Sequence, residues 1–212
     1  VMAYILYFAR RVDLQSADMH DHSWNSRLMP GAKNRTLGLV GFGGIGTEVA
    51  KRAVPFGMKV IYFCRHPNPA DDAAYGVQSV SMEELLKESD YVVAAVPLTD
   101  QTFHLFNEEC IAQMKAGSVL INIARGPVVD EEALAQALAS GHLGGCAVDV
   151  FPKEPCTDSV LTRYSNALLT PHSATSTAEN SKATNFAAAN NLVNYLKKDI
   201  DAKYVVVQGT RY

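Results

Sequence analysis

The sequence predicts an α/β fold with a mostly parallel, doubly wound sheet and helices on both of its faces. From Thr36 onward, short apolar runs alternate with amphipathic segments, which is the pattern of repeated βαβ units. Several of these runs lack alternation of polar and apolar residues, as is typical of strands buried between two helical layers. The 212 residues are 48% hydrophobic and 19% charged, which is enough apolar material for a sizeable core.

The individual elements follow from this alternation and from local boundary signals. The expected strands are residues 37–40, 60–63, 91–96, 119–123, 146–150 and 167–169, and a short β-like tail covers 204–207. The expected helices are residues 45–56, 82–88, 108–114, 131–139 and 176–198. Capping boxes are expected at Ser81 with Glu84 and at Ser176 with Glu179, and Asp130 is expected to be an N-cap. Three glycines stand where a helix should stop, namely Gly57, Gly117 and Gly141.

The segment before the first strand predicts a helix followed by an arm. Residues 2–12 are apolar with helical spacing, and a polar stretch over 13–33 follows them. This stretch contains the only tryptophan, Trp24, which we expect to be a packing anchor rather than a platform for a ligand.

Charge and cysteine content exclude several classes of protein. A formal net charge of -3 gives no reason to expect a nucleic-acid partner. The apolar residues at the start are far fewer than the roughly 20 that span a bilayer, so no membrane partner is expected. Neither a metal site nor a redox dithiol is expected, because the four cysteines lie far apart in the sequence. Reduced cysteines indicate an intracellular protein, which we expect to be cytoplasmic.

A glycine pattern lies directly between the first expected strand and the helix after it. Residues 41–46 match G-x-G-x-x-G, in which Gly41 permits a tight turn and Gly43 admits a pyrophosphate to the backbone. Gly46 allows close packing of helix on strand, and Gly44 and Ile45 open the helix whose N-terminus attracts the anion. The pattern predicts a Rossmann dinucleotide-binding domain; the alternative is a glycine-rich turn that binds nothing.

The end of the second strand bears on which dinucleotide is bound. An NAD-binding domain carries an acidic residue there, about 20 residues after the glycines, to hold the ribose 2′-hydroxyl. This chain has Cys64, Arg65 and His66 instead. Arg65 could pair with a 2′-phosphate, which favours NADP over NAD. The alternative is that Arg65 stacks on the adenine and either cofactor binds.

Three polar residues follow later strands at the edge where ligands bind in doubly wound sheets. Arg125 could hold a carboxylate and polarise a carbonyl oxygen. Glu154 and His172 could form an acid-base pair in which the carboxylate orients the imidazole. Taken singly, a histidine in such a loop is more often structural than catalytic, and a glutamate between a lysine and a proline is usually only a solvated charge. Together, and downstream of a nucleotide turn, they predict an active site.

Five segments of the chain resemble, in the same order, the D-isomer-specific 2-hydroxyacid dehydrogenase family, and especially its glyoxylate and hydroxypyruvate reductases. These segments are residues 37–46, 97–102, 122–130, 147–155 and 170–172. The resemblance implies that Arg125 binds substrate and polarises its carbonyl group, that His172 transfers a proton and that Glu154 supports His172. It implies that Asp149 contacts the nicotinamide carboxamide. It also implies a cofactor site that includes Val96, Pro97, Thr102, Ile123 and Ala124 together with Arg125 and His172.

The implied reaction is hydride transfer between a nicotinamide cofactor and C2 of a small D-2-hydroxy acid or 2-keto acid. Arg65 is similar to the corresponding residue of NADP-using reductases, and glutamate at Glu154 differs from the glutamine of the formate dehydrogenase branch. After His172 the family usually continues Ile-Gly, whereas this chain has Ser173 and Ala174. The main alternative is an NAD(H)-sensing corepressor of the same family, which keeps the arginine, glutamate and histidine. An NAD-using hydrolase with a similar core is a further alternative, but its substrate residues are not found.

The resemblance also implies a domain plan. Residues 1–35 would form an inter-domain helix and dimer arm, 36–175 the dinucleotide-binding domain, and 176–212 a helix and tail that return to an N-terminal substrate domain. We therefore expect a homodimer joined through the nucleotide-binding domain. We also expect the 212-residue chain alone to bind cofactor with little or no turnover.

Overall fold

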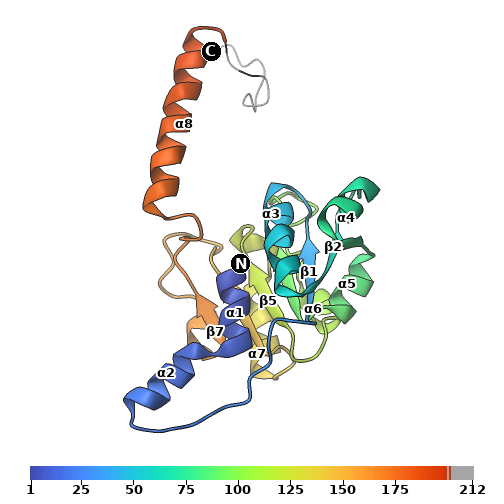
Figure 1. Cartoon of the computed structure of the whole chain (residues 1–212), viewed down its shortest axis with the longest axis vertical. Coiled ribbons are helices and arrows are strands. Elements are labelled where there is room, and N and C mark those ends of the chain that lie inside the picture. Colours follow the sequence, from blue (N-terminus) through green and yellow to red (C-terminus); the bar gives the residue numbers. More distant parts are fainter. Residues whose placement is uncertain (200, 202–212) are drawn as a thin grey trace. The chain divides into compact units, whose positions relative to one another are not determined.

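The computed structural model describes residues 1–199 and 201, and the chain divides into two compact units, Val1–His172 and Ser173–Tyr212. The first unit holds a seven-stranded sheet in the order β3-β2-β1-β4-β5-β6-β7 (Figure 1). Every neighbouring pair of strands is parallel, which confirms the predicted fold class. The strands are β1 Thr36–Val40, β2 Lys59–Phe63, β3 Gln78–Ser79, β4 Tyr91–Ala94, β5 Val119–Asn122, β6 Gly145–Val148 and β7 Ala167–Leu169.

Helices cover both faces of this sheet. Because side chains alternate along a strand, Leu37 and Leu39 of β1 pack with the helices over residues 2–10 and 44–53, whereas Val40 packs with the helices over 82–88, 108–112 and 131–139 on the other face. The α-helices are α1 Met2–Arg10, α2 Val12–His20, α3 Gly44–Ala53, α4 Pro69–Tyr75, α5 Met82–Glu88, α6 Glu108–Ala112, α7 Glu131–Ala139 and α8 Ala178–Leu196. Short 3-10 helices cover Val54–Phe56, Gly126–Val128 and Val160–Arg163.

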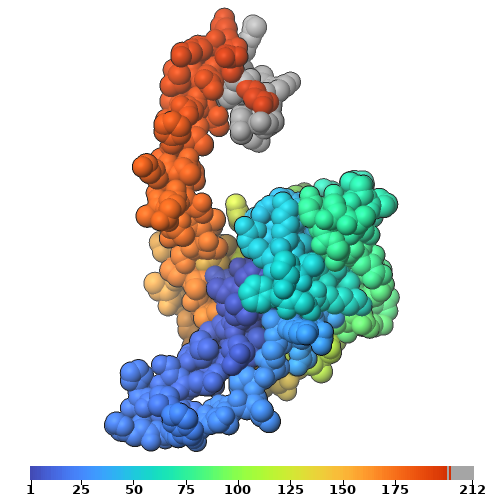
Figure 2. All heavy atoms as spheres, viewed as in Figure 1, coloured from blue at the N-terminus to red at the C-terminus, as the bar shows by residue number. Residues whose placement is uncertain are grey.

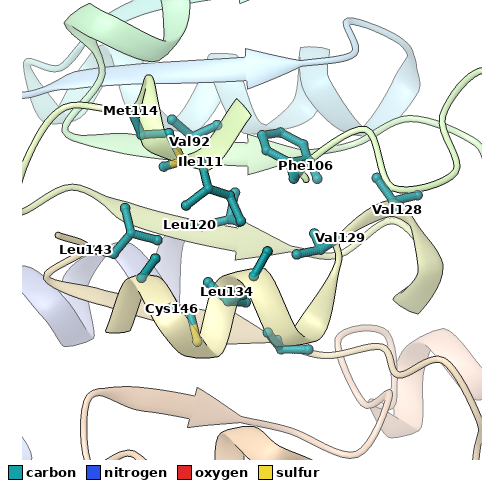
Figure 3. Close-up of a cluster of buried hydrophobic side chains, with 14 of the residues drawn as sticks. Val92, Phe106, Ile111, Met114, Leu120, Val128, Val129, Leu134, Leu143 and Cys146 are labelled. Carbon is teal, nitrogen blue, oxygen red and sulfur yellow. The ribbon is translucent and has the colours of Figure 1, made fainter. Parts of the chain in front are cut away.

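The core on the α7 side joins the sheet to the loops that follow β4 and β5. Val92 of β4, Leu120 of β5 and Leu134 of α7 point toward one another, with Phe106 and Val128 beside them (Figure 3). All five are at most 1% exposed. Burial of such side chains contributes roughly 1.5–3 kcal/mol each, so this core fixes where the strand-end loops lie.

Asp90 ties together the amino ends of the central strands. Its carboxylate accepts hydrogen bonds from Arg35 Nη1 at 3.1 Å, Lys115 Nζ at 2.9 Å and the Thr36 N–H at 2.8 Å. Burial raises the pKa of Asp90, but these hydrogen bonds outweigh it and hold the pKa below its ordinary value. The starts of β1, β4 and β5 are thereby aligned, and their carboxyl ends meet at the opposite edge.

The N-terminal segment differs from the sequence prediction in two ways. The helix expected over 2–12 ends at Arg10, because Arg11 has φ 40° in the left-handed region and a separate helix, α2, begins after it. The side chain of Arg11 is held by both carboxylate oxygens of Asp13. Trp24 is 85% exposed, so the expectation that it anchors packing is wrong within this chain. Figure 1 shows α2 and the arm after it extending away from the sheet, and the same segment forms the projecting blue atoms of Figure 2.

Other boundaries were predicted only in part. The N-caps at Ser81 and Asp130 are confirmed, since their side chains accept N–H groups of the first helical turn. The helix expected from Ser176 begins instead at Ala178, with Thr177 as its N-cap. Helix α4 and strand β3 were not predicted, while the tail expected over 204–207 lies outside the described residues. Several elements end earlier than expected: β4 at Ala94, β5 at Asn122, β6 at Val148, α3 at Ala53, α6 at Ala112, before Gly117, and α8 at Leu196. In turn, β1, β2, β6 and α3 each begin one residue earlier than expected. Among the described residues, no helix is long and apolar enough to cross a membrane.

Candidate cofactor and catalytic site

The turn between β1 and α3 has the backbone that the glycine pattern requires. Gly41 has φ 103°, and a Cβ there would lie 2.5 Å from the Ala95 carbonyl oxygen. A Cβ on Gly46 would lie 2.5 Å from the Gly41 carbonyl oxygen, so α3 packs directly on the turn. Apart from the adjacent residues and the nearby backbone of α3, no atom of the described residues lies within 4 Å of a Cβ built on Gly43 or Gly44. The turn is therefore closed on its inner side and open to an anion at the start of α3.

An aromatic contact holds this turn on the neighbouring strand. Phe42 stacks on Tyr62 of β2, with ring centroids 4.0 Å apart and an interplanar angle of 21°. The Tyr62 hydroxyl donates to Asp72 Oδ1 in α4 at 2.8 Å. Burial, followed by this hydrogen bond, raises the pKa of Tyr62 to about 12. Phe42 occupies a position that the glycine pattern leaves unspecified, so the sequence prediction missed its role.

A crevice of about 450 Å³ lies at the carboxyl ends of β4 and β5, beside the start of α3. It is lined by Ile45, Ala95, Val96, Pro97, Leu98, Ile123, Ala124 and Arg125. Six of these were predicted to contact the cofactor, and the structure brings them together. Ala95 and Leu98 were not predicted. Doubly wound sheets bind ligands at this kind of position, outside the strand ends.

None of the three residues after β2 lines that crevice. Arg65 and His66 are exposed and Cys64 is half-buried. Arg65 Nη1 donates to Gln101 Oε1 at 3.4 Å, which joins the loop after β2 to the loop after β4. Gln101 was not predicted as a site residue, because nothing in its local sequence indicates that its partner is Arg65.

A buried amide shapes the loop that carries Arg125. Asn122, the last residue of β5, is 1% exposed. Its Oδ1 accepts the Ala124 N–H at 3.1 Å, and its Nδ2 donates to the Arg125 carbonyl oxygen at 3.1 Å. The exposed side chain of Arg125 donates from Nη1 to the Ala124 carbonyl oxygen at 2.7 Å. The buried amide of Asn122 therefore fixes the backbone of the loop, while Arg125 lines the crevice.

His172 and Glu154 meet at the next strand ends along the same edge. His172 Nδ1 lies 2.7 Å from Glu154 Oε2, and Glu154 Oε1 accepts the Phe151 N–H at 2.9 Å. The His172 backbone has φ 49°, in the left-handed region, and its N–H donates to the Asp149 carbonyl oxygen at 2.8 Å. This uncommon backbone conformation, fixed by hydrogen bonding, turns the imidazole toward the carboxylate.

The environment of Glu154 favours its charged form. The hydrogen bond to His172 comes first, then the Phe151 N–H, and the charge of Arg125 also contributes; together they hold the pKa of Glu154 below its ordinary value. An ionised carboxylate only accepts hydrogen bonds, so the His172 nitrogen that faces it, Nδ1, carries a proton. The other ring nitrogen, Nε2, is then the one that can give or take a proton.

Gly126 sets the spacing between the Arg125 loop and the Glu154 loop. A Cβ on Gly126 would lie 2.0 Å from the Phe151 carbonyl carbon and 2.3 Å from the Pro152 nitrogen. Both contacts are to backbone, which cannot move aside as a flexible side chain could. The two loops that hold Arg125 and Glu154 are in direct backbone contact only because residue 126 has no side chain.

Two of the predicted cofactor residues have their polar groups engaged within the protein. Asp149 is 1% exposed and accepts hydrogen bonds from Thr170 Oγ1 at 2.5 Å and the Tyr4 hydroxyl at 3.4 Å. Thr102 Oγ1 donates to the Pro97 carbonyl oxygen at 2.6 Å and accepts the Thr99 N–H at 2.8 Å. Neither residue lines the crevice. Their predicted contacts with cofactor stay predictions.

The substitution His172→Gln should raise the pKa of Glu154 toward its ordinary value, because the largest cause of its lowering is removed. A carboxyl-carbon NMR titration of the 212-residue chain measures this change. Because the folded-state pKa is lowered, the contribution of Glu154 to stability is present above the unfolded-state pKa. It is lost as pH falls through the folded-state value.

His142 provides the control for that titration, because its ring bonds the Ile111 carbonyl oxygen instead of a carboxylate. His142→Gln should leave the pKa of Glu154 unchanged. An unchanged Glu154 pKa in the His172→Gln protein would contradict the prediction.

The substitution Gly126→Ala should force the Arg125 and Glu154 loops apart. We expect it to lower the free energy of unfolding by about 1–3 kcal/mol, as overpacking does. It should also raise the pKa of Glu154, since the Phe151 N–H would shift. Denaturant unfolding and the same NMR titration measure these effects. Gly31→Ala is the control, because a Cβ there meets only the Lys33 nitrogen, at 3.9 Å. Equal stability and Glu154 pKa in the two variants would refute the spacing role.

Comparison with known sequences identifies relatives of the chain. A family model described as D-isomer specific 2-hydroxyacid dehydrogenase, NAD binding domain, matches residues 2–174. Glyoxylate reductase from Thermococcus litoralis is 38% identical over 212 residues, covering 96% of this chain and 64% of that protein. Hydroxypyruvate reductase from Thermotoga maritima is 41% identical over 184 residues, covering 84% and 59%. The chain thus spans less than two thirds of the length of these relatives.

Solved structures show the same relationship. D-lactate dehydrogenase from Aquifex aeolicus, complexed with NAD and lactic acid, superposes with a TM-score of 0.85 at 31% identity. The match covers 93% of this chain and 65% of that one. NAD-dependent formate dehydrogenase from Staphylococcus aureus in complex with NAD gives a TM-score of 0.87 at 28% identity, covering 98% and 64%. The chain therefore belongs to the D-isomer-specific 2-hydroxyacid dehydrogenase family and matches its NAD-binding domain.

Proposed function

We propose that this protein is an NADPH-preferring oxidoreductase that interconverts small 2-keto acids and D-2-hydroxy acids, of the glyoxylate and hydroxypyruvate reductase type. The observation that carries the proposal is the 2.7 Å contact between His172 Nδ1 and Glu154 Oε2, at the sheet edge where Arg125 lines the crevice. The names of the relatives from Thermococcus litoralis and Thermotoga maritima support this substrate class.

The turn over Gly41 to Gly46 fits a dinucleotide, because its outer side has space for a pyrophosphate and its inner side does not. Ile45, Val96 and Pro97 would line the site beyond the phosphates. A nicotinamide cofactor bound there would supply or accept the hydride. At the end of the second strand, where an NAD-binding domain carries an acidic residue that would repel a 2′-phosphate, this chain has Arg65, which supports NADPH over NADH.

The remaining chemistry belongs to three side chains. Arg125 would pair with a negatively charged keto acid and meet the charge that develops on its carbonyl oxygen. His172 would donate a proton from Nε2 during reduction and accept it there during oxidation. Glu154 would orient the imidazole through Nδ1 and stabilise its charged form, since its own pKa is held low.

The 212-residue chain is proposed to supply only part of this active site. Helix α8 carries Phe186, Leu192, Tyr195 and Leu196 at 60–72% exposure. We propose that these side chains pack against an N-terminal substrate domain, and that residues 1–35 link that domain to the dinucleotide-binding domain at 36–175. The chain alone would then bind cofactor with little turnover. The cytoplasmic location expected from the cysteines is part of the same proposal.

The proposed activity is tested by following oxidation of NADPH by the full-length protein with glyoxylate, hydroxypyruvate and pyruvate. His172→Gln should lower kcat by about 10²–10⁴, the usual contribution of a positioned acid-base group. His142→Gln is the matched control, since its ring lies in a separate contact with Ile111, and it should retain activity.

Three outcomes would count against parts of the proposal. Absence of NADPH or NADH oxidation with every small 2-keto acid, while cofactor still binds, would favour an NAD(H)-sensing corepressor. Full activity in His172→Gln would refute the assigned proton transfer. Rapid glyoxylate reduction by the 212-residue chain alone would refute the proposed division of the active site between two domains.

We also propose that the protein is a homodimer whose arm, around Trp24, is covered by the partner. Trp24 is 85% exposed and Leu28 is fully exposed within one chain, which is unfavourable for large apolar side chains. Sedimentation should show a dimer, and emission from Trp24, the only tryptophan, should shift as the protein dissociates on dilution. Leu28→Asp should give a monomer, whereas Phe56→Asp, at an exposed position outside the arm, should not. A monomeric wild type at all concentrations would refute this proposal.

A further inference from the structure

The loop after β4 is a compact turn that holds its shape without help from Gln101. Thr102 Oγ1 bonds both the Pro97 carbonyl oxygen, at 2.6 Å, and the Thr99 N–H, at 2.8 Å. The Thr102 N–H also donates to the Thr99 carbonyl oxygen at 3.0 Å. Gln101 lies within this turn and is exposed. Its amide is therefore available for a contact outside the loop.

That contact is with Arg65. Arg65 Nη1 donates to Gln101 Oε1 at 3.4 Å, across 36 positions of sequence. The two residues come from loops after β2 and β4, and β1 with its phosphate turn lies between these strands in the sheet. Such a long, exposed hydrogen bond contributes little to stability. Its effect is to restrict the directions that a flexible guanidinium can take.

Because its hydrogen-bond partner, Gln101, is a neutral amide, the positive charge of Arg65 is not neutralised by this contact. Among residues 1–199 and 201, Arg65 is in no ion pair. The carboxylate of Asp72, in the helix that follows, is bound by the Tyr62 hydroxyl and the Ser79 N–H. A neutral amide oxygen orients a guanidinium and keeps its positive charge available, whereas a carboxylate would cancel that charge.

We propose that Gln101 is a positioning residue for Arg65 and thereby helps to determine cofactor specificity. It holds the guanidinium at the ribose end of the site, where its remaining N–H groups bind the 2′-phosphate of NADPH. This inference rests on the proposed NADPH preference and assigns a second residue to it.

The test is to measure dissociation constants of the 212-residue chain for NADPH and NADH, and for adenosine 2′,5′-bisphosphate and AMP. Gln101→Leu should weaken binding of the two 2′-phosphorylated ligands about three- to fivefold, the effect of one exposed hydrogen bond. Gln101→Glu should weaken it about tenfold, because its carboxylate both neutralises Arg65 and repels the phosphate. Binding of NADH and AMP should change less than twofold in both variants.

Gln113→Glu is the matched control, since it adds the same charge to an exposed position at the end of α6 and should change neither affinity.

Arg65→Ala separates the two proposals. If it lowers NADPH affinity while both Gln101 variants match wild type, the role of Gln101 is refuted and the NADPH preference stands. If wild type prefers NADH and Arg65→Ala has no effect, the NADPH preference is refuted, and the role of Gln101 with it. If Gln101→Leu weakened the binding of NADPH and of NADH equally, the role of Gln101 in cofactor specificity would also be refuted.

Discussion

The parallel arrangement of all seven strands is the constraint on which the candidate site depends. In a parallel sheet every strand delivers the chain to the same edge, so residues far apart in sequence converge there. Arg65 follows β2, Arg125 follows β5, and His172 follows β7. Asp90 supports this arrangement from the opposite edge by binding the residues that start β1 and precede β5. A single strand in the reverse direction would carry its loop, and its functional side chain, away from the crevice.

Convergence at one edge is not sufficient, because the loops must also approach closely enough for their side chains to act together. Two glycines allow such an approach. The backbone at Gly41 lies against that of Ala95, and the backbone at Gly126 lies against that of Phe151 and Pro152. The first contact shapes the turn for the phosphates, and the second sets Arg125 beside the loop of Glu154. In both places the space that a side chain would occupy is filled by the backbone of another loop. This rigidity gives an exposed pair such as Glu154 and His172 a fixed geometry.

The sequence predicted what depends on local pattern. The alternation of apolar runs indicated the strands, and the glycines at 41–46 indicated a turn whose inner contacts the structure confirms. The left-handed Arg11 was missed, because nothing in an apolar helical pattern signals a break at an arginine. Trp24 was expected to pack, yet a sequence pattern shows that a side chain is apolar and not whether its own chain covers it.

Within the site, the missed features are those that depend on contacts distant in sequence. Gly126 was visible only as part of a segment shared with a family, whereas its contact with Phe151 requires knowing that two loops touch. Asn122 is recognisable as a polar residue ending a buried strand, but its two hydrogen bonds depend on the path of the loop. Asp149 is a further example, since its sequence context does not indicate that its carboxylate accepts hydrogen bonds from Thr170 and Tyr4.

The distribution of charge along the edge completes the argument. Each of the two arginines is oriented by a neutral oxygen, Arg65 by Gln101 Oε1 and Arg125 by the Ala124 carbonyl. In the part of the chain that the structure describes, neither is in an ion pair, so both keep their charge for an anionic group of a ligand. Glu154 is directed to His172 instead. Under the proposed function the edge would separate two tasks, because the unneutralised cations would bind anionic groups while the paired histidine would exchange a proton.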